Sequence, residues 1–395
     1  MKLGHAGEGA LARRGAIVRR PAQRGGLDRA GMLAMITCST LGPAKLQLDG
    51  APAPRQLLWR KNVALLIYLA RSPRRTRTRE HLIGLLWGDK PADAAAHDLS
   101  EAIRTLRSCA GSDAVQTASG QVTLRSGVVQ LDVERFEELC HREDWAGAAA
   151  MVAGEFLEGF SVPHASEFED WLRAERLTWN QRAAGALVHR AEALARSGQL
   201  AQSAEVAERA LTLDRRSERA VRALLRILAL DGRRANALGR YADFSRYLAE
   251  EMGAKPDQET AALAERIRRQ DATRRPPPSA VPAPLGGEGR RAPLVGRSRE
   301  LELLLETWNA GRNRPHATLL LIEGDPGTGR TRLAAEVLAR ARLEGVAVST
   351  TRAVEADESQ AWSGVLALAR GGLIDAPGIA AAPAGVLGAL ARQLP

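Results

Sequence analysis

The alternation of hydrophobic and polar residues predicts a mixed unit of strands and helices over residues 32–131. Two sets of short strand-like runs enclose three amphipathic helices. The expected elements are, in chain order, one or two strands within 33–48, helices at 57–70, 79–87 and 94–109, two short strands around a Ser-Gly turn within 115–125, and a closing strand at 128–133. Strands, three helices and then a hairpin form the order of a winged helix-turn-helix domain.

Local signals predict where these helices begin and end. Thr78 is the expected N-cap of the second helix, and Glu80 is favourably placed in its first turn. Asp93 is the expected N-cap of the third helix, and Gly111 lies just past its end. In the first helix, the apolar residues at helical spacing, Leu58 among them, are expected on one side.

Residues 132–270 follow an almost wholly helical pattern with a weak internal repeat. Gly198 and Gly232 begin similar segments 34 residues apart, and Ala210 then matches Phe244. That period belongs to tetratricopeptide helix pairs. We therefore expect a domain of tetratricopeptide-like helices over this part of the chain.

The rest of the chain is divided by a segment rich in Pro, Gly and Arg at 271–292, which we interpret as a linker. After it the pattern predicts a helix at 300–308, a buried-type strand at 317–323 and a helix at 332–343. The expected fold is thus multidomain and mainly α: a winged helix-turn-helix (α+β), a helical-repeat domain, and a partial α/β module over 293–395.

The net charge of +10 is distributed unevenly along the chain. Residues 32–131 carry thirteen Lys and Arg against seven Asp and Glu, whereas residues 132–270 carry twenty-one against twenty-four. Residues 1–31 carry seven against two, and this segment is either a disordered basic arm or precedes a true start at Met32 or Met35. The basic excess in the predicted winged helix favours a polyanionic partner.

Cysteine usage and hydropathy limit the environment of the protein. The three cysteines, Cys38, Cys109 and Cys140, are too few and too scattered for a disulfide framework or a metal cluster. The longest apolar run, Val63–Ala70, is too short to span a membrane. We therefore expect a reduced, cytoplasmic protein with no membrane contact. The dispersed histidines and carboxylates give no catalytic group.

The third predicted helix has one apolar and one polar face. A helical wheel places His97, Glu101 and Arg104 opposite the apolar stripe, with Ser100 and Thr105 on the flanks. In a helix-turn-helix the second helix of the pair enters the major groove, where Arg donates to guanine and Glu accepts from cytosine. The alternative for this helix alone is an ordinary solvated face.

The segment between the first two helices favours the DNA-binding interpretation. Arg71–Arg79 contains five arginines in nine residues, and forked guanidinium groups suit phosphate oxygens. Such contacts give salt-dependent affinity without base specificity. The candidate DNA-contacting residues are Arg74, Arg75, Arg77, Arg79, His97, Ser100, Glu101, Arg104, Thr105, Arg107 and Arg125.

Four segments in order resemble one family. They are LLIYLARSPRRTRTREHLIGLLW (65–87), LSEAIRTLRS (99–108), EFEDWLRAERL (167–177) and YADFSRYLAEEMGAKPDQETAAL (241–263). With them, residues 33–270 resemble the bacterial transcriptional activators of the antibiotic regulatory protein (SARP) type. That family joins an OmpR-like winged helix to a bacterial transcriptional activator domain.

The resemblance implies double-stranded DNA sites of direct-repeat form near promoters, homodimerisation through the helical domain and contact with RNA polymerase. One feature of the recognition helix departs from the family. Asp98 and Glu101 stand where relatives tend to carry neutral or basic residues. The base preference of relatives therefore does not transfer to this sequence.

A third motif lies between the predicted strand at 317–323 and the helix after it. Residues 324–331 (GDPGTGRT) fit the spacing of a P-loop, and the strand-turn-helix context supports that interpretation. Backbone N–H groups would hold the phosphates of ATP at the helix N-terminus. The candidate nucleotide-binding residues are Gly324, Gly327, Thr328, Gly329, Arg330 and Thr331, with Thr331 also a candidate ligand of Mg²⁺.

Two observations argue against ATP hydrolysis by this P-loop module. Arg330 replaces the usual lysine, and no apolar strand ending in paired acids follows the motif. PLVGRSRELELLL (293–305) resembles the lead-in to signal-transducing ATPase modules, so the chain is expected to stop inside such a module. The main hypothesis is thus a DNA-binding regulator rather than an enzyme. The alternatives are a nucleotide-dependent signalling ATPase switch and a protein-binding repeat scaffold.

Overall fold

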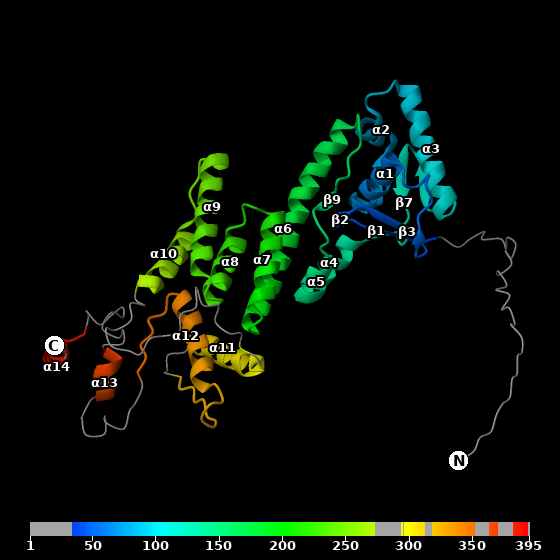
Figure 1. The fold of residues 1–395 in the computed structure, drawn as a ribbon. Helices are drawn as coiled ribbons and strands as arrows, with labels where there is room; N and C mark the ends of the chain where they lie inside the picture. The colour runs from blue at the N-terminus through cyan, green and yellow to red at the C-terminus, as the bar shows by residue number, and fades with distance from the viewer. Residues whose placement is uncertain are drawn as a thin grey trace, which may run out of the picture.

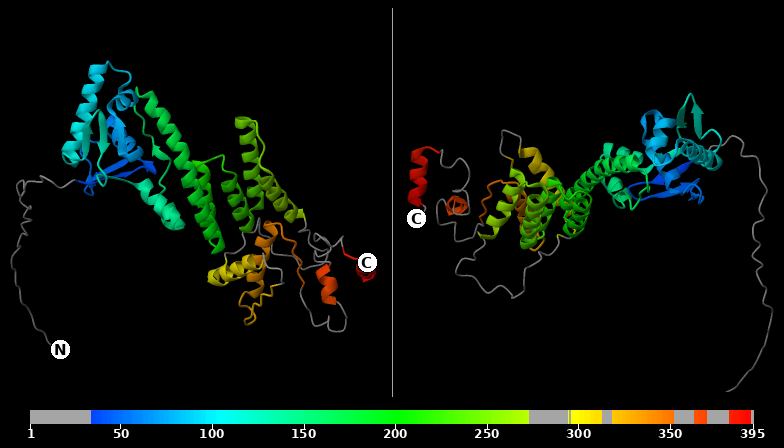
Figure 2. Two further views of the ribbon diagram at one scale, coloured as in Figure 1. Left: turned by 180° about the vertical axis from the view of Figure 1, so that it is seen from behind. Right: turned by 90° about the horizontal axis from the view of Figure 1, so that it is seen from above.

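The computed structural model describes residues 34–272, 294, 296–312, 318–351, 363–369 and 382–393. The basic segment 1–31 and nearly all of the predicted linker 271–292 therefore lie outside the described residues. Figures 1 and 2 show an elongated molecule, with the β-containing domain at one end and the C-terminal helices at the other.

The β-containing domain has the elements of a winged helix. A first sheet has the strand order β4-β3-β1-β8, with β1 antiparallel to β3 and parallel to β8. Its strands are β1 (Ile36–Ser39), β3 (Lys45–Leu48), β4 (Ala51–Pro52) and β8 (Val129–Leu131). Three helices pack on one another: α1 (Arg60–Arg71), α2 (Arg79–Trp87) and α3 (Ala92–Ala110). The predicted order of strands, three helices and hairpin is confirmed.

The wing is a second sheet with one strand more than the predicted hairpin. Its order is β5-β7-β6, formed by β5 (Thr76–Thr78), β7 (Gln121–Leu124) and β6 (Val115–Ala118). Strand β5 follows a short 3-10 turn, η1 (Pro73–Arg75), and pairs antiparallel with β7. The segment expected to be a simple turn between helices is therefore partly a strand. The sequence pattern did not predict this strand, because its partner lies more than forty residues later in the chain.

The predicted helix ends are confirmed in part. The Thr78 side chain accepts a hydrogen bond from the backbone N–H of His81, as an N-cap does. Helix α3 begins before the predicted cap, because the Pro91 carbonyl already accepts from Ala95 N. Asp93 therefore lies in the first turn, where its charge favours the helix dipole. Leu58, expected on an apolar side, precedes α1 and is 46% exposed.

The helical domain is a stack of antiparallel helices, as predicted. It consists of α4 (Asp132–His141), α5 (Trp145–Met151), α6 (Ser166–Arg196), α7 (Leu200–Leu213), α8 (Glu218–Leu230), α9 (Arg234–Met252) and α10 (Gln258–Ala272). Gly198 and Gly232 both adopt a positive φ in the turns before α7 and α9, where glycine costs least. The matched positions Ala210 and Phe244 are both buried. The repeat is therefore structural.

The long helix α6 joins the helical domain to the winged helix. Tyr68 of α1 packs edge-on against Trp171 and hydrogen-bonds through its hydroxyl to His81 Nε2, 2.6 Å away. Arg71 lies over the Trp179 ring, 4.9 Å from its centroid, and 3.5 Å from the Glu175 carboxylate. A short parallel pair, β2 (Gly42–Pro43) and β9 (Phe156–Glu158), adds backbone contacts. The two domains therefore share one hydrophobic core.

The regular elements that the structure describes in the C-terminal part are all helices. Its elements are α11 (Ser298–Arg312), α12 (Arg330–Leu343), α13 (Ser363–Leu368) and α14 (Ala384–Gln393). The strand predicted at 317–323 is not formed: residues 318–323 have no regular structure, and Leu319 and Leu321 are 91% and 74% exposed. A single strand needs neighbours to satisfy its backbone, and the described part of 294–393 contains no other strand.

None of the helices in the described ranges is both long and apolar enough to cross a membrane.

Candidate nucleic-acid interface and phosphate-binding loop

Helix α3 separates its apolar and polar residues as the sequence predicts. The apolar stripe is at most 4% exposed at every position: Ala95, Leu99, Ala102, Ile103 and Leu106. On the other side, the side chains of His97 and Arg104 are 72% and 69% exposed. Figure 1 shows α3 at the end of the molecule farthest from the C-terminal helices. The polar side of α3 is thus open to a large partner.

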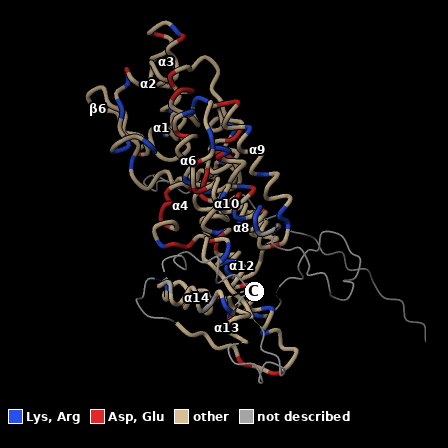
Figure 3. Tube along the Cα trace, turned by 90° about the vertical axis from the view of Figure 1, so that its left-hand side faces the viewer, with Lys and Arg blue, Asp and Glu red and all other residues tan. Residues whose placement is uncertain are grey.

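Two acidic residues of α3, Asp98 and Glu101, are paired with neighbouring bases. Glu101 forms an ion pair with Arg104 and lies 3.9 Å from His97 Nε2. Asp98 accepts a 2.6 Å hydrogen bond from Lys90 Nζ. Along α3 the acidic residues lie in the first half and the arginines in the second, and Figure 3 shows both charges in this part of the chain. The exposed side of α3 is mixed in charge, with Arg104 held beside a carboxylate.

The arginines of the 71–79 segment divide into one exposed side chain and several held ones. Arg74 is exposed, and its side chain has no partner within the described ranges. Arg75 instead donates to the Val129 carbonyl at 3.0 Å and to Glu134 Oε1 at 2.9 Å. Its guanidinium group fastens the turn to the first sheet and α4.

Two further arginines of this segment support the helix pair. Arg77 Nε donates to Ser72 Oγ at 2.9 Å, and its guanidinium lies 5.5 Å from the Tyr68 ring centroid. Arg79 donates to Ser100 Oγ at 2.9 Å and so connects α2 with α3. Arg77 and Arg79 are therefore half-buried and held by hydroxyl groups, whereas Arg74 is exposed.

The remaining candidates connect α3 with the wing. Arg107 donates to the Val115 carbonyl at 2.8 Å and to Thr117 Oγ1 at 3.0 Å, both on β6. Arg125, at the end of β7, is 48% exposed and lies 3.5 Å from Asp113. Thr105 is half-buried, and its carbonyl accepts from Ser108 Oγ. Arg107 thus fixes the position of the wing, which carries the exposed Arg125, relative to α3.

A groove beside α3 was not predicted from the sequence. A cavity of about 800 Å³ lies between the first turn of α1 and the polar side of α3. Trp59, immediately before α1, is 67% exposed, and Lys61 lies over the Trp87 ring, 5.3 Å from its centroid. Burial lowers the pKa of Lys61, with Asp89 acting in the opposite direction. In the sequence, the available signal was a tryptophan directly followed by Arg60 and Lys61.

The glycine-rich loop has the backbone of a phosphate cradle. Gly327 and Gly329 have φ values of 85° and 89°, and α12 begins directly afterwards at Arg330. Thr328 closes the turn, since its N–H and its hydroxyl both donate to the Asp325 carbonyl. A Cβ on Gly324 would lie 3.0 Å from Thr328 Oγ1, so the loop excludes larger residues there.

The residues present fit the phosphate groups of a nucleotide. The first N–H groups of α12, a fourteen-residue helix, are oriented along its axis, and Arg330 and Thr331 are exposed beside them. The Thr331 hydroxyl is one oxygen ligand for Mg²⁺. The described residues after the motif contain no strand that ends in acids, and 352–362 and 370–381 lie outside the description.

Family models match two parts of the chain. The model described as bacterial transcriptional activator domain matches residues 125–268, and the model described as AAA ATPase domain matches residues 293–393. The first match begins directly after the wing strand β7, seven residues before α4. The chain thus contains the helical activator domain and an ATPase-like module.

Two regulators are similar over most of this chain. Regulatory protein AfsR of Streptomyces griseus is 29% identical over 341 residues, which are 77% of this chain and 32% of that protein. AfsR of Streptomyces coelicolor is 28% identical over 337 residues, 76% and 32% respectively. The chain therefore spans about a third of the length of the curated relatives it matches.

One solved structure is Mycobacterium tuberculosis EmbR in complex with a low affinity phosphopeptide. The match covers 71% of this chain and 73% of the EmbR chain, with 19% sequence identity and a TM-score of 0.47. In the order of its two matched domains, and over most of its length, this chain is therefore similar to SARP-type bacterial regulators with a fused ATPase-like module.

Proposed function

We propose that this protein is a transcriptional activator that binds double-stranded DNA through its winged helix. Helix α3 would enter the major groove, with Arg104 and His97 facing base edges, and Arg74 and Arg125 facing phosphates. One observation carries the proposal: α3 is buried on one side only, and its open side is fixed in orientation by Arg79 and Arg107.

The same proposal assigns residues 32–131 to DNA binding and residues 132–270 to homodimer and RNA polymerase contacts. The supporting observations are the match to the bacterial transcriptional activator domain and the shared core of the two domains. Such a protein acts in the cytoplasm, where bacterial DNA lies. A dimer on direct repeats would give half-sites separated by whole helical turns.

The DNA-binding proposal is tested with duplexes selected from a random library by the full chain. Arg104→Ala is expected to weaken binding of the selected duplex by about tenfold or more and to relax selection at one position. Arg173→Ala is the matched control, because Arg173 is also exposed on a helix and paired three residues away with Asp170. If no duplex is enriched, or if both variants bind alike, the proposal is wrong.

We also propose that residues 324–331 bind a nucleoside triphosphate with Mg²⁺ but do not hydrolyse it in this chain alone. The phosphate-fitting backbone and the AAA ATPase domain match support binding. Arg330 keeps the positive charge of the usual lysine, yet its planar group is bulkier. A fluorescent-nucleotide titration is expected to saturate and Arg330→Lys to tighten it. The absence of saturable binding in both proteins would contradict this proposal.

A further inference from the structure

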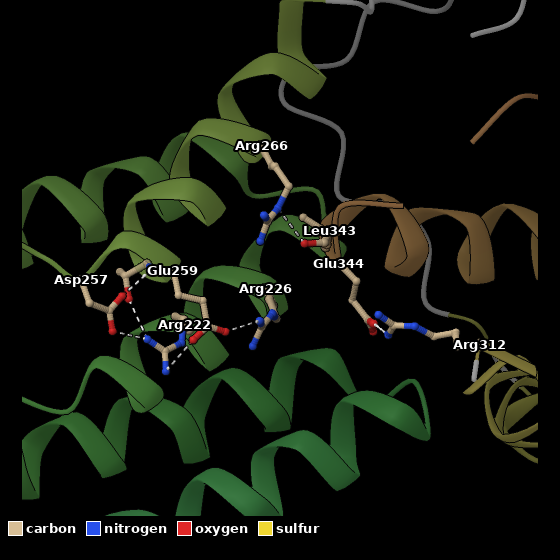
Figure 4. A network of polar contacts seen from close by, with 9 residues as sticks. Arg222, Arg226, Asp257, Glu259, Arg266, Arg312, Leu343 and Glu344 are labelled. Atoms are coloured by element: carbon tan, nitrogen blue, oxygen red, sulfur yellow. Dashed lines mark hydrogen bonds and ion pairs between the residues drawn. The ribbon is translucent and has the colours of Figure 1, made fainter. Parts of the chain in front are cut away.

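A cavity of about 640 Å³ lies where α12 docks against the helical domain (Figure 4). One wall comes from α6, α8 and α10, and the other from the ends of α11 and α12. None of the candidate DNA-contacting or P-loop residues lines it. The cavity is thus separate from both proposed sites and depends on both modules.

The docking contacts use arginines that satisfy helix carbonyls. Arg340 of α12 is nearly buried, donating to Glu336 Oε1 at 2.9 Å and to the Ala195 carbonyl of α6 at 2.8 Å. Arg266 of α10 donates through Nε to the Leu343 carbonyl at 3.1 Å. The carbonyls at the C-terminal ends of α6 and α12 give negative potential here. The two arginines offset part of it.

The side chains that line the cavity carry an excess of positive charge. They include five arginines and three glutamates: Arg196, Arg226, Arg266, Arg312, Arg340, Glu192, Glu259 and Glu344. Each glutamate already has an arginine partner. Glu192 lies 3.4 Å from Arg219, Glu259 lies 3.3 Å from Arg222, and Glu344 pairs with Arg312.

Three arginines keep unused hydrogen-bonding capacity. Within the described ranges, Arg196 and Arg266 have no carboxylate within ion-pair distance. The buried Nε of Arg226 has no hydrogen-bond partner there, and its terminal nitrogen is 3.7 Å from Glu259. A buried donor without an acceptor is unfavourable. These groups together call for an anionic acceptor inside the cavity.

The floor of the cavity is apolar. Ala223, Ile227 and Leu230 of α8 and Leu343 of α12 form it, and each is under 10% exposed. The volume lies in the range of small-molecule sites, which combine an apolar lining with a few polar groups. We propose that this cavity binds a small carboxylic acid with an apolar body, whose carboxylate meets Arg196, Arg226 and Arg266. The bound acid would bridge the helical domain and α12.

The proposal is tested on the full chain by calorimetric titration with three probes. Octanoate is expected to bind with one-to-one stoichiometry, octylammonium to show no saturable binding, and inorganic phosphate to leave octanoate binding unchanged at equal concentration. Equal binding of octanoate and octylammonium would show an unselective apolar site and overturn the proposal. Displacement of octanoate by an equal concentration of phosphate, or no binding of octanoate, would overturn it as well.

Variants assign the binding to this cavity. Arg196→Ala is expected to weaken octanoate binding about tenfold, the effect typical of a lost charge-assisted hydrogen bond. Arg246→Ala is the control, since Arg246 is exposed on α9, pairs with Asp243 at 2.6 Å and does not line the cavity. Ala195→Leu keeps every arginine and narrows the cavity, so it should weaken binding too. If Arg196→Ala and Ala195→Leu remain folded by circular dichroism and bind as the parent does, the proposal is wrong.

Discussion

Arg74 and Arg75 are adjacent in sequence, yet we expect their replacement by alanine to have opposite effects. Both adopt a left-handed backbone, with φ of 53° and 54°, so the chain reverses between them. Arg74 extends into solvent, whereas the Arg75 side chain is only 21% exposed and bonds to Val129 and Glu134. The prediction is that Arg74→Ala impairs DNA binding and Arg75→Ala impairs stability.

The magnitude for Arg75→Ala follows from its two hydrogen bonds. A bond that involves a charged group contributes about 1.5–3 kcal/mol. The ion pair with Glu134 counts for less, because that carboxylate is 39% exposed and screened by solvent. We therefore expect Arg75→Ala to lower the free energy of unfolding by about 2 kcal/mol. Urea denaturation would show a lower midpoint at an unchanged slope.

The expected effect of Arg74→Ala is electrostatic. Loss of one phosphate contact should reduce the slope of log K against log salt concentration by about 0.9, with little change in the urea midpoint. Arg75→Ala should leave that slope unchanged once the protein is folded. The reasoning is refuted if Arg75→Ala reduces the salt slope at parental stability, or if Arg74→Ala destabilises the fold and leaves the slope intact.

Three further outcomes follow from buried or paired groups. Asp132→Asn should lower the free energy of unfolding by about 2–3 kcal/mol in urea, because the Asp132 carboxylate accepts from both the N–H and the hydroxyl of Thr40 at 2.8 and 2.5 Å. Burial, and then the Asp132 charge, raise the pKa of the Cys38 thiol far above its usual value. When the folded protein is alkylated and analysed by mass spectrometry, Cys109 should therefore be modified and Cys38 should not, until urea is added. Burial, and then the charge of Arg219, lower the pKa of His189, so the unfolded chain binds a proton at this residue more readily than the folded protein does. The stabilisation by neutral His189 is therefore present above about pH 6.5 and decreases as the pH falls. The urea midpoint of His189→Phe should accordingly depend less on pH between 7.5 and 5.5 than that of the parent protein. Equal pH dependence in parent and variant would contradict the last expectation.

Local patterns predicted the elements whose signals are local. The Thr78 cap, the glycine turns at 198 and 232, and the one-sided burial of α3 each depend on residues within a few positions of one another. Strand β5 was missed because it exists only by pairing with β7. The strand predicted at 317–323 failed for the same reason, since apolar residues form a strand only where neighbouring strands are supplied.

The roles of individual arginines were beyond sequence reasoning. Composition within 71–79 indicates a basic segment, but whether a guanidinium faces solvent depends on acceptors far along the chain. Arg75 donates hydrogen bonds to Val129 and Glu134, and Arg79 donates one to Ser100. A count of arginines therefore overestimates the number free to meet phosphate. The exposed Trp59 was missed for the converse reason, because an apolar residue beside a helix start is usually assigned to the core.

The two junctions of the molecule differ in chemistry, and that difference indicates how a signal would travel. The winged helix meets α6 through aromatic side chains of Tyr68, Trp171 and Trp179 within one continuous core, so these domains should move together. Helix α12 meets the helical domain both through polar contacts, such as that of Arg340 with the Ala195 carbonyl, and through Leu343 at its end, which packs into the main core. The small core under the P-loop, around Leu301 and its neighbours, is separate. Polar contacts exchange readily with water, and tightly packed apolar ones do not. Nucleotide at the P-loop, or an acid in the adjoining cavity, would therefore act on the second junction, and the first would carry the change to α3.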